Sequence, residues 1–201
     1  MPVSDPSQDP SQDSFEEAAP VKILIAGGFG VGKTTLVETV SEIEPLRTEE
    51  RLTAAGVGVD DLAGVESKAV TTVAMDFGRI TLTDAGVVLY LFGTPGQERF
   101  WFMWDDLLNG ALGAVVLVDT RRLDRSFGAV DFFENRGLPF VVGANCFHGE
   151  QPYTAEEIKA ALRLRDPDTP VLLLDARRRG DVRETLLSLL DLLIEKSSIP
   201  V

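Results

Sequence analysis

A glycine-rich run near the N-terminus carries the clearest chemistry in the sequence. Residues 27–35, GGFGVGKTT, satisfy the spacing G-x-x-x-x-G-K-[ST] of a phosphate-binding loop. Glycines let the backbone curl so that successive N–H groups point at a polyphosphate, while the lysine supplies a positive charge and the hydroxyl a Mg²⁺ ligand. We therefore predict that a nucleotide contacts Gly27, Gly28, Gly30, Val31, Gly32, Lys33, Thr34 and Thr35.

The sequence on either side of this loop fits the motif. The apolar run VKILIA precedes it at 21–26, and a helical pattern follows from 33 to about 43, ending near Pro45. A phosphate-binding loop requires a strand before it and a helix after it. This context argues against the alternative, a glycine-rich turn that matches by chance.

The rest of the chain alternates apolar strands with helices. The pattern predicts an antiparallel hairpin across residues 83–86, three later strands each followed by a helix, and a final helix with an apolar stripe. Such alternation implies an α/β fold with a mainly parallel sheet and helices on both faces. Ligands of such sheets bind beyond the carboxyl ends of the strands. The six predicted strands are 21–26, 72–83, 86–93, 111–119, 138–145 and 170–176.

Two further segments stand outside this alternation. Residues 1–20 repeat D-P-S-Q and carry five acids with no base, so we predict a disordered acidic tail before one domain at 21–201. Residues 46–71 are polar and contain only a weak helical hint. We expect that long loop to be a nucleotide-sensing switch, and a tolerated insertion is the alternative.

Composition limits the partners and the compartment. The 201 residues are 44% apolar and carry a net charge of −13, which argues against nucleic acid and anionic membranes as main partners. Cys146 is the only cysteine, which fits a reducing cytoplasm. We find no apolar stretch long enough to span a bilayer, no signal peptide and no prenylation cysteine. We therefore expect a cytoplasmic protein without its own membrane anchor.

Over residues 21–195 the chain resembles the Ras-like small GTPases. TVAMDF and GTPGQERF are similar to the switch segments of Rab-type members. Together with the acidic tail, NCFHG and LDARRR, they are most similar to the bacterial conservon-type (CvnD-like) GTPases, distant relatives of the MglA gliding-motility switch. The resemblance implies a Ras-like six-stranded P-loop fold and a GTP-binding switch that hydrolyses GTP slowly to GDP and phosphate.

The resemblance also implies roles for single residues. Lys33 and Thr34 would hold the phosphates and Mg²⁺, and Thr72 would add a second metal ligand when a γ-phosphate is present. The N–H of Gly96 would contact that phosphate, and Gln97 would orient the attacking water. Loss of the γ-phosphate would release Thr72 and Gly96, which makes the site an on/off switch. A charge-stabilising arginine would come from a partner or from this chain, where the candidates are Arg99, Arg47 and Arg51.

Four positions depart from the family pattern. Gly93 replaces the aspartate of the Mg²⁺ site, for which Asp76 or Asp119 could compensate. Asp119 also completes a pattern resembling a Walker B carboxylate. Phe29 replaces a glycine close to the γ-phosphate, so we expect slow intrinsic hydrolysis. His148 replaces the aspartate that reads guanine, and Cys146 replaces its lysine neighbour.

Base recognition would then depend on two short segments. Asn145 survives from the guanine-reading motif, and residues 175–177 resemble the S-A-K segment of the family. The N–H of Ala176 could bind a purine keto oxygen, beside Arg177. GTP is the favoured nucleotide, while ATP or weak selectivity stays open.

An unbroken apolar run, Phe100–Trp101–Phe102–Met103–Trp104, follows directly after switch II, the segment 93–99. A helix cannot turn five consecutive side chains into one core face, so we expect some to be exposed as a docking patch; the alternative is that most pack on the sheet. The resemblance implies a roadblock-type regulator as partner and a sensor-kinase-like membrane protein that recruits the chain to the membrane.

Three functions follow from these observations. The first is a GTP-binding switch with partner-stimulated hydrolysis. The second is a nucleotide-bound scaffold without hydrolysis, indicated by Gly93, Phe29 and His148. The third is a P-loop kinase, which would need an arginine-rich lid; the run 177–179 is the one basic cluster we considered for it.

Overall fold

The computed structural model describes residues 18–53, 70–147, 149 and 152–197. Its strands form one seven-stranded sheet in the order β2-β3-β4-β1-β5-β6-β7. β3 is antiparallel to both β2 and β4, and the other neighbours are parallel. The strands are β1 (Ala19–Ala26), β2 (Leu46–Thr53), β3 (Val70–Leu82), β4 (Val87–Gly93), β5 (Ala111–Val118), β6 (Phe140–Asn145) and β7 (Val171–Leu174).

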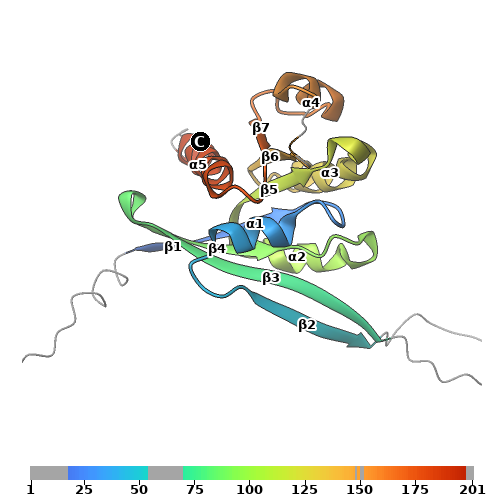
Figure 1. Cartoon of the computed structure of the whole chain (residues 1–201), viewed down its shortest axis with the longest axis vertical. Helices are drawn as coiled ribbons and strands as arrows, with labels where there is room; N and C mark the ends of the chain where they lie inside the picture. Colours follow the sequence, from blue (N-terminus) through green and yellow to red (C-terminus); the bar gives the residue numbers. More distant parts are fainter. Residues whose placement is uncertain (1–17, 54–69, 148, 150–151, 198–201) are drawn as a thin grey trace, which may run out of the picture.

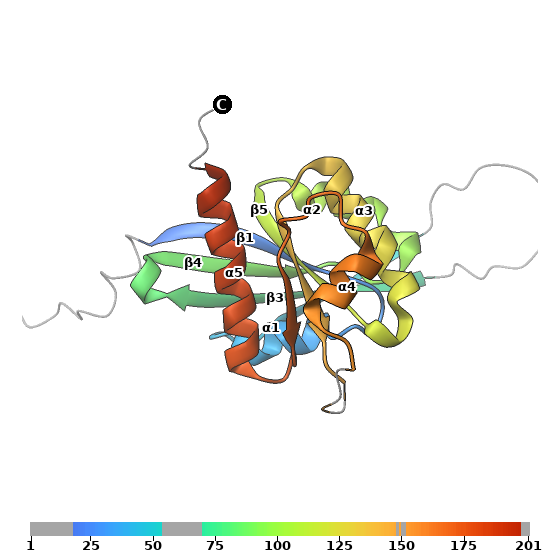
Figure 2. The same ribbon diagram turned by 90° about the horizontal axis from the view of Figure 1, so that it is seen from above.

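The helices cover both faces of this sheet, as the alternating pattern predicted (Figure 1). Short 3₁₀ turns η1, η2 and η3 connect the main elements, and α5 lies across the strands when the molecule is seen from above (Figure 2). The helices are α1 (Lys33–Val40), α2 (Phe102–Leu108), α3 (Phe127–Arg136), α4 (Ala155–Leu162) and α5 (Arg179–Ser197); the turns are η1 (Thr83–Ala85), η2 (Glu98–Phe100) and η3 (Thr120–Ser126). In the part of the chain that the structure describes, no helix has the length and apolarity to cross a bilayer.

Alternate residues of the central strands divide the interior into two cores. Ile23 and Ile25 of β1 join the core under α1 and α5, whereas Leu24 and Ala26 join the core under α2, α3 and α4. This alternation follows from the two-residue period of a strand, and it explains why β1 is apolar from Ile23 to Ala26. β1, buried on both sides, is therefore a rigid base for the glycine-rich loop that follows it.

All six predicted strands are present, and β2 is a seventh that the sequence analysis missed. It lies in the segment predicted as a long switch loop, and it pairs with β3 from Leu46 opposite Phe77 to Thr53 opposite Val70 (Figure 1). Its sequence, LRTEERLT, lacks a sustained apolar alternation, so the partner strand rather than local propensity determines its conformation. The remainder of that loop, 54–69, lies outside the described residues.

The boundaries of other elements differ slightly from the predictions. β1 begins at Ala19, inside the segment assigned to the tail, because Ala19 and Pro20 pair with β4. Residues 1–17 of the tail lie outside the described residues. α4 begins with a capping box between Thr154 and Glu157.

The aromatic run after switch II divides between the core and the surface. Trp104 is fully buried and donates its indole N–H to the carbonyl of Pro95 at 3.0 Å, and Phe100 is also buried. Phe102 is 64% exposed. Some of the run is therefore exposed, as expected, but Trp104 belongs to the core beneath α2 and α3.

Candidate nucleotide-binding site

The glycine-rich loop has a shape that requires glycine at three positions. Gly27, Gly30 and Gly32 have φ angles of 133°, 75° and 107°, which side-chain-bearing residues rarely adopt. A Cβ added to Gly27 would collide with the carbonyl of Leu117 on β5, and one added to Gly32 would collide with the side-chain amide of Asn145. The loop is thus held closely against the ends of β5 and β6.

Lys33 lies beneath this loop and is 9% exposed. Its ammonium group donates to the carbonyls of Gly27 and Gly28, both at 2.8 Å. Burial lowers the pKa of Lys33 from 10.5 to about 8, and the nearby charge of Asp76 partly opposes that effect. Gly96 of switch II lies beside the ammonium group, since a Cβ added there would be 2.6 Å from Nζ. A phosphate group near Nζ would favour the charged form.

The hydroxyl of Thr34 donates to the carboxylate of Asp76 at 2.6 Å. Asp76 comes from β3 and fills the space beside Gly93 on β4, where an added Cβ would be 3.1 Å from Oδ2 of Asp76. Of the two aspartates named as substitutes for the missing carboxylate, Asp76 is therefore the one beside Thr34. Thr34 and Asp76 line a cavity of about 310 Å³ together with Lys33 and Thr94.

The donor set of this cavity suits a hard cation. The hydroxyl of Thr34 and the carboxylate of Asp76 are oxygen ligands of the kind that Mg²⁺ prefers, directly or through water. The hydroxyl of Thr94 is buried and has no hydrogen-bond partner among the described residues, which leaves it available to a bound water. The sequence analysis did not single out Thr94.

Asp119 does not contribute to this cavity. Its carboxylate accepts from the backbone N–H and guanidinium of Arg121, at 3.0 and 2.9 Å, and from Arg122 at 3.2 Å. The hydrogen bonds from Arg121 lower the pKa of Asp119. The carboxylate caps η3, so the Walker B role considered for Asp119 finds no support.

Thr72, the predicted second metal ligand, lies within β3 and four residues before Asp76. With a strand rise of about 3.3 Å per residue, its backbone is about 13 Å along the strand from Asp76. The structure therefore does not bring Thr72 to Thr34. The predicted arginines Arg47 and Arg51 lie on β2, opposite Asp76 and Thr72.

At the predicted base-binding end, Asn145 connects two loops. Its amide donates to the carbonyl of Val31 at 2.9 Å, and its carbonyl accepts from the N–H of Ala176 at 3.0 Å. A purine keto oxygen would have to replace this second bond to receive the N–H of Ala176. Arg177 pairs with Asp175 at 2.7 Å and lowers the pKa of Asp175 to about 2. His148 lies outside the described residues.

The loop after Asn145 carries a contact that the sequence did not indicate. The guanidinium of Arg121 lies 3.8 Å from the ring centre of Phe147, a cation–π contact between η3 and the predicted base-binding end. Because Arg121 also bonds Asp119, it links this loop to the end of β5.

Switch II forms a second, larger cavity beside the first. Gln97, Arg99 and Trp101 line it together with Phe29, and its volume is about 700 Å³. Phe29, 70% exposed, and Gly96 line both cavities. The structure thus places the predicted catalytic residues Gln97 and Arg99 next to the predicted phosphate cavity, with the ring of Phe29 at the boundary.

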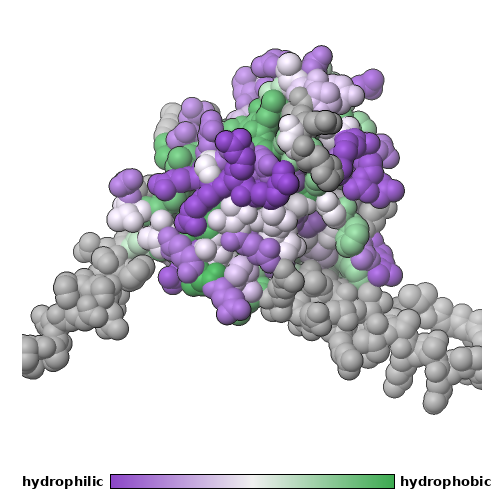
Figure 3. Space-filling view, in the orientation of Figure 1, coloured by the Kyte–Doolittle hydropathy of each residue, from purple (hydrophilic) through white to green (hydrophobic). Residues whose placement is uncertain are grey.

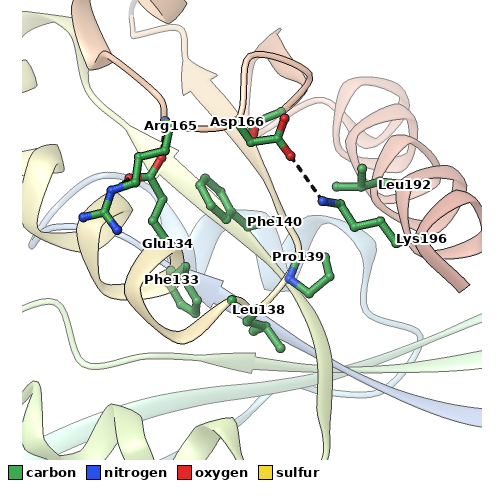
Figure 4. Close-up of a pocket in the computed structure, with 11 residues that line it drawn as sticks. Phe133, Glu134, Leu138, Pro139, Phe140, Arg165, Asp166, Leu192 and Lys196 are labelled. Atoms are coloured by element: carbon green, nitrogen blue, oxygen red, sulfur yellow. Dashed lines mark hydrogen bonds and ion pairs between the residues drawn. The ribbon is translucent and has the colours of Figure 1, made fainter. Parts of the chain in front are cut away.

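A further cavity and a hydrophilic face are two other surface features to weigh against the glycine-rich loop as places for a phosphate. A cavity of about 150 Å³ between α3, β6 and α5 has an apolar floor, and the ion pairs of Arg165 with Glu134 and Lys196 with Asp166, both 3.2 Å, stand at its rim (Figure 4). The face shown in Figure 3 is most hydrophilic between α1 and α5, and its hydrophobic spots are small and separate. Neither feature competes with the glycine-rich loop as a phosphate site.

Comparison with known proteins agrees with this geometry. The model of a family described as "Conserved hypothetical ATP binding protein" matches residues 25–199. The uncharacterized protein MJ1339 of Methanocaldococcus jannaschii is 31% identical over 127 residues, which are 62% of this chain and 69% of that protein. Rab-32C of Dictyostelium discoideum is 29% identical over 152 residues, 71% of this chain and 59% of that protein. Human Rab-7b is 30% identical over 122 residues, 61% of this chain and 52% of that protein. The chain thus spans less than two thirds of either Rab protein.

Solved structures with the same fold include parts of an iron transporter. The cytosolic domain of T. maritima FeoB in a GDP form matches with a TM-score of 0.62 and 16% identity, covering 92% of this chain and 66% of that one. The G domain of the same transporter matches with a TM-score of 0.57 and 18% identity, covering 89% of this chain and 99% of that one. The fold is therefore that of a Ras-like G domain.

Proposed function

The chain belongs to the family of conserved hypothetical ATP binding proteins, and from this premise we propose that it is a nucleotide-dependent switch that binds GTP or GDP with Mg²⁺ and hydrolyses GTP slowly. The observation that carries the proposal is the arrangement of Lys33, Thr34 and Asp76 around one cavity at the end of β1. Distant similarity to Rab proteins, which are Ras-related, supports the same function.

Mg²⁺ would be held at the hydroxyl of Thr34, with Asp76 supplying the negative charge that Gly93 lacks. When bound, the ion would neutralise charge on the phosphates. Thr72 would bind this ion only after the first residues of β3 move toward Thr34. The proposed difference between the GTP-bound and GDP-bound states is whether Thr72 binds Mg²⁺. That movement is the switch.

Adenine is the alternative base, and two observations favour considering it. The family description names ATP, and His148 stands where an aspartate would accept hydrogen bonds from guanine. The test is calorimetric titration of the Mg²⁺-loaded protein with GDP, ADP and non-hydrolysable analogues of GTP and ATP. Binding of GDP at sub-micromolar Kd with weaker ADP binding would support the GTP switch, whereas preference for ADP would support an ATP-binding protein.

Hydrolysis separates the switch from a nucleotide-bound scaffold. Gly93 and Phe29 favour the scaffold on sequence grounds, but the carboxylate of Asp76 occupies the space beside Gly93. Single-turnover assays with labelled GTP distinguish the two functions. No release of phosphate, with or without a regulator, would leave the scaffold as the function.

We further propose that the chain is a conservon-type GTPase of the cytoplasm whose partner is a roadblock-type regulator, with recruitment to the membrane by a sensor-kinase-like protein. Phe29 and Phe102 are the exposed aromatic residues on either side of switch II that such a partner would cover. Phe102→Ala tests this contact, because loss of Phe102 leaves the core intact. Capture of the same regulator by Phe102→Ala and by wild type at equal affinity would contradict the proposed surface.

A further inference from the structure

The 3₁₀ turn η3 packs directly against the glycine-rich loop. A Cβ added to Gly28 would lie 3.8 Å from the carbonyl of Arg125, and one added to Gly30 would lie 3.9 Å from the guanidinium of Arg122. A narrow crevice between the two segments is lined by Phe29 and Val31 on one side and by η3 on the other. η3 therefore lies against the glycine-rich loop and lines two cavities beside it, although it is about 90 residues away in the sequence.

This turn is fixed in place at both ends. At its start, the carboxylate of Asp119 accepts from the backbone N–H of Arg121 and from the side chains of Arg121 and Arg122. Beyond its end, Trp101 from the aromatic run after switch II packs so closely on Gly128 that an added Cβ would collide with the indole ring. The backbone of Arg125 between these two anchors is thus held at a defined position beside the loop.

The three arginines of η3 differ in their partners. Arg121 and Arg122 are paired with Asp119. The side chain of Arg125 forms no hydrogen bond or ion pair with any other residue that the structure describes. Instead it lines the large cavity shared with Gln97 and Phe29. Its positive charge is therefore available to an anion in that cavity.

We infer that Arg125 is a catalytic arginine built into the chain, which contacts the terminal phosphoryl group during hydrolysis from the side opposite to Lys33. The inference rests on the proposed function, since it needs a bound nucleoside triphosphate. Phe29 and Gly96 line both the cavity of Arg125 and the phosphate cavity of Lys33, so the two cavities adjoin at these residues. The sequence analysis considered Arg99, Arg47 and Arg51 for this role and did not consider Arg125.

The chemistry explains why a second cation is useful. The oxygen of water forms a bond to the γ-phosphorus, the bond from that phosphorus to the β–γ bridging oxygen breaks, and GDP leaves with the electron pair. The protons of the water remain on the phosphate product or pass to solvent. Negative charge is spread over the transferred group and the leaving oxygen in the transition state, and an arginine there stabilises it.

The position of Arg99 makes it the competing candidate. Its guanidinium lies 4.8 Å from the ring centre of Phe100, and it lines the same cavity from η2. Because η2 belongs to switch II, its position would change with the nucleotide, whereas η3 is anchored by Asp119. The two arginines can be separated by single substitutions.

The experiment compares wild type with Arg125→Ala, Arg125→Lys and Arg99→Ala, and uses Arg183→Ala on the exposed side of α5 as the matched control. Two quantities are measured: the single-turnover rate of GTP hydrolysis, and retention of fluorescent GDP with Mg²⁺ and aluminium fluoride, which mimics the transferred phosphoryl group. We expect Arg125→Ala to slow hydrolysis by on the order of 10²-fold and to lose the aluminium fluoride complex. Its Kd for GDP should stay within about threefold of wild type, because the contact belongs to the transition state.

Each outcome bears on a different claim. Hydrolysis by Arg125→Ala within about threefold of wild type would overturn the inference, and loss in Arg99→Ala alone would assign the role to Arg99. A wild type that binds GDP but neither hydrolyses GTP nor retains aluminium fluoride would overturn the inference and leave nucleotide binding standing. A wild type that binds no nucleotide would overturn the proposed function itself. Partial activity in Arg125→Lys, which keeps the charge without the planar fork, is the expected intermediate result.

Discussion

Nucleotide binding should be accompanied by proton uptake at Lys33. In the unliganded protein, burial lowers the pKa of this lysine to about 8. A polyphosphate beside Nζ favours the charged form and raises the pKa again. Affinity should therefore be greatest below pH 8 and should decrease as the pH rises through 8, because the lysine must then take up a proton before it can pair with the phosphate.

The size of the effect follows from the pKa. With a pKa of about 8, Lys33 is roughly one tenth neutral at pH 7, one half neutral at pH 8 and nine tenths neutral at pH 9, and those fractions are the protons taken up per nucleotide bound. The Kd should accordingly be about tenfold weaker at pH 9 than at pH 7. Calorimetric titration with ADP or GDP in two buffers of different ionisation enthalpy measures the number of protons taken up directly. This measurement does not depend on how the affinity changes with pH.

Asp76 supplies an internal check, because its negative charge raises the pKa of Lys33. Asp76→Asn should move the pH at which uptake is half-maximal below 8. Asp84→Asn, on the exposed turn η1, should leave it unchanged. Uptake of less than about 0.1 proton at pH 8 by the wild type would refute the reasoning, since Lys33 would then have the same charge before and after binding.

Three further predictions test the site and the core by substitution. Asp76→Ala should weaken Mg²⁺-dependent nucleotide binding by about 10- to 100-fold, and adding Gly93→Asp should restore most of it, as measured by Mg²⁺ titration; no recovery would show that the two positions are not equivalent. Trp104→Ala should lower the free energy of unfolding by about 3–5 kcal/mol in urea titrations, while Phe102→Ala should change it by less than about 0.5 kcal/mol. Asn145→Ala, which removes the bonds to two loops, should cost about 1–3 kcal/mol of stability and weaken GDP and ADP equally; unchanged binding would exclude Asn145 from the site.

The elements that the sequence predicted well are those with local signals. β1 is apolar from Ile23 to Ala26, the glycine spacing of 27–35 has a steric cause, and the capping box at Thr154 is complete within four residues. Each of these can be recognised without knowing what lies beside it. They account for the sheet, the phosphate loop and the helices that flank them.

Contacts between segments distant in sequence were the ones missed. β2 has a polar sequence and exists as a strand only in its pairing with β3. The place of Arg125 beside Gly28 depends on how η3 follows β5, and nothing in the spacing of that segment indicates it. The burial of Trp104 depends likewise on α3, whose Phe132 and Phe133 rings pack against its indole.

Asp76 shows how a motif can be lost while its chemistry stays. The register of β3 and β4 sets Phe77 opposite Phe92, so Asp76 and Gly93 are neighbours across the two strands. Side chains at opposite positions of an antiparallel pair lie on the same face and about 5 Å apart. A carboxylate can therefore reach Thr34 from either strand. Gly93 is consequently weak evidence for a site that has lost its metal.

The two ends of the site differ in what they retain, and this leads to a last prediction. The phosphate end keeps a buried lysine, a hydroxyl and a carboxylate, whereas at the base end the N–H of Ala176 is already bonded to Asn145 and His148 replaces the guanine acceptor. We expect the phosphates to provide most of the binding energy. The ratio of Kd values between GMP and GDP should then exceed the ratio between ADP and GDP when all three are titrated under the same conditions. If the ratio of Kd values between ADP and GDP is instead the larger one, the base end reads guanine through contacts that the N-K-x-D comparison does not reveal. Residues 145–149 would then be the segment to examine.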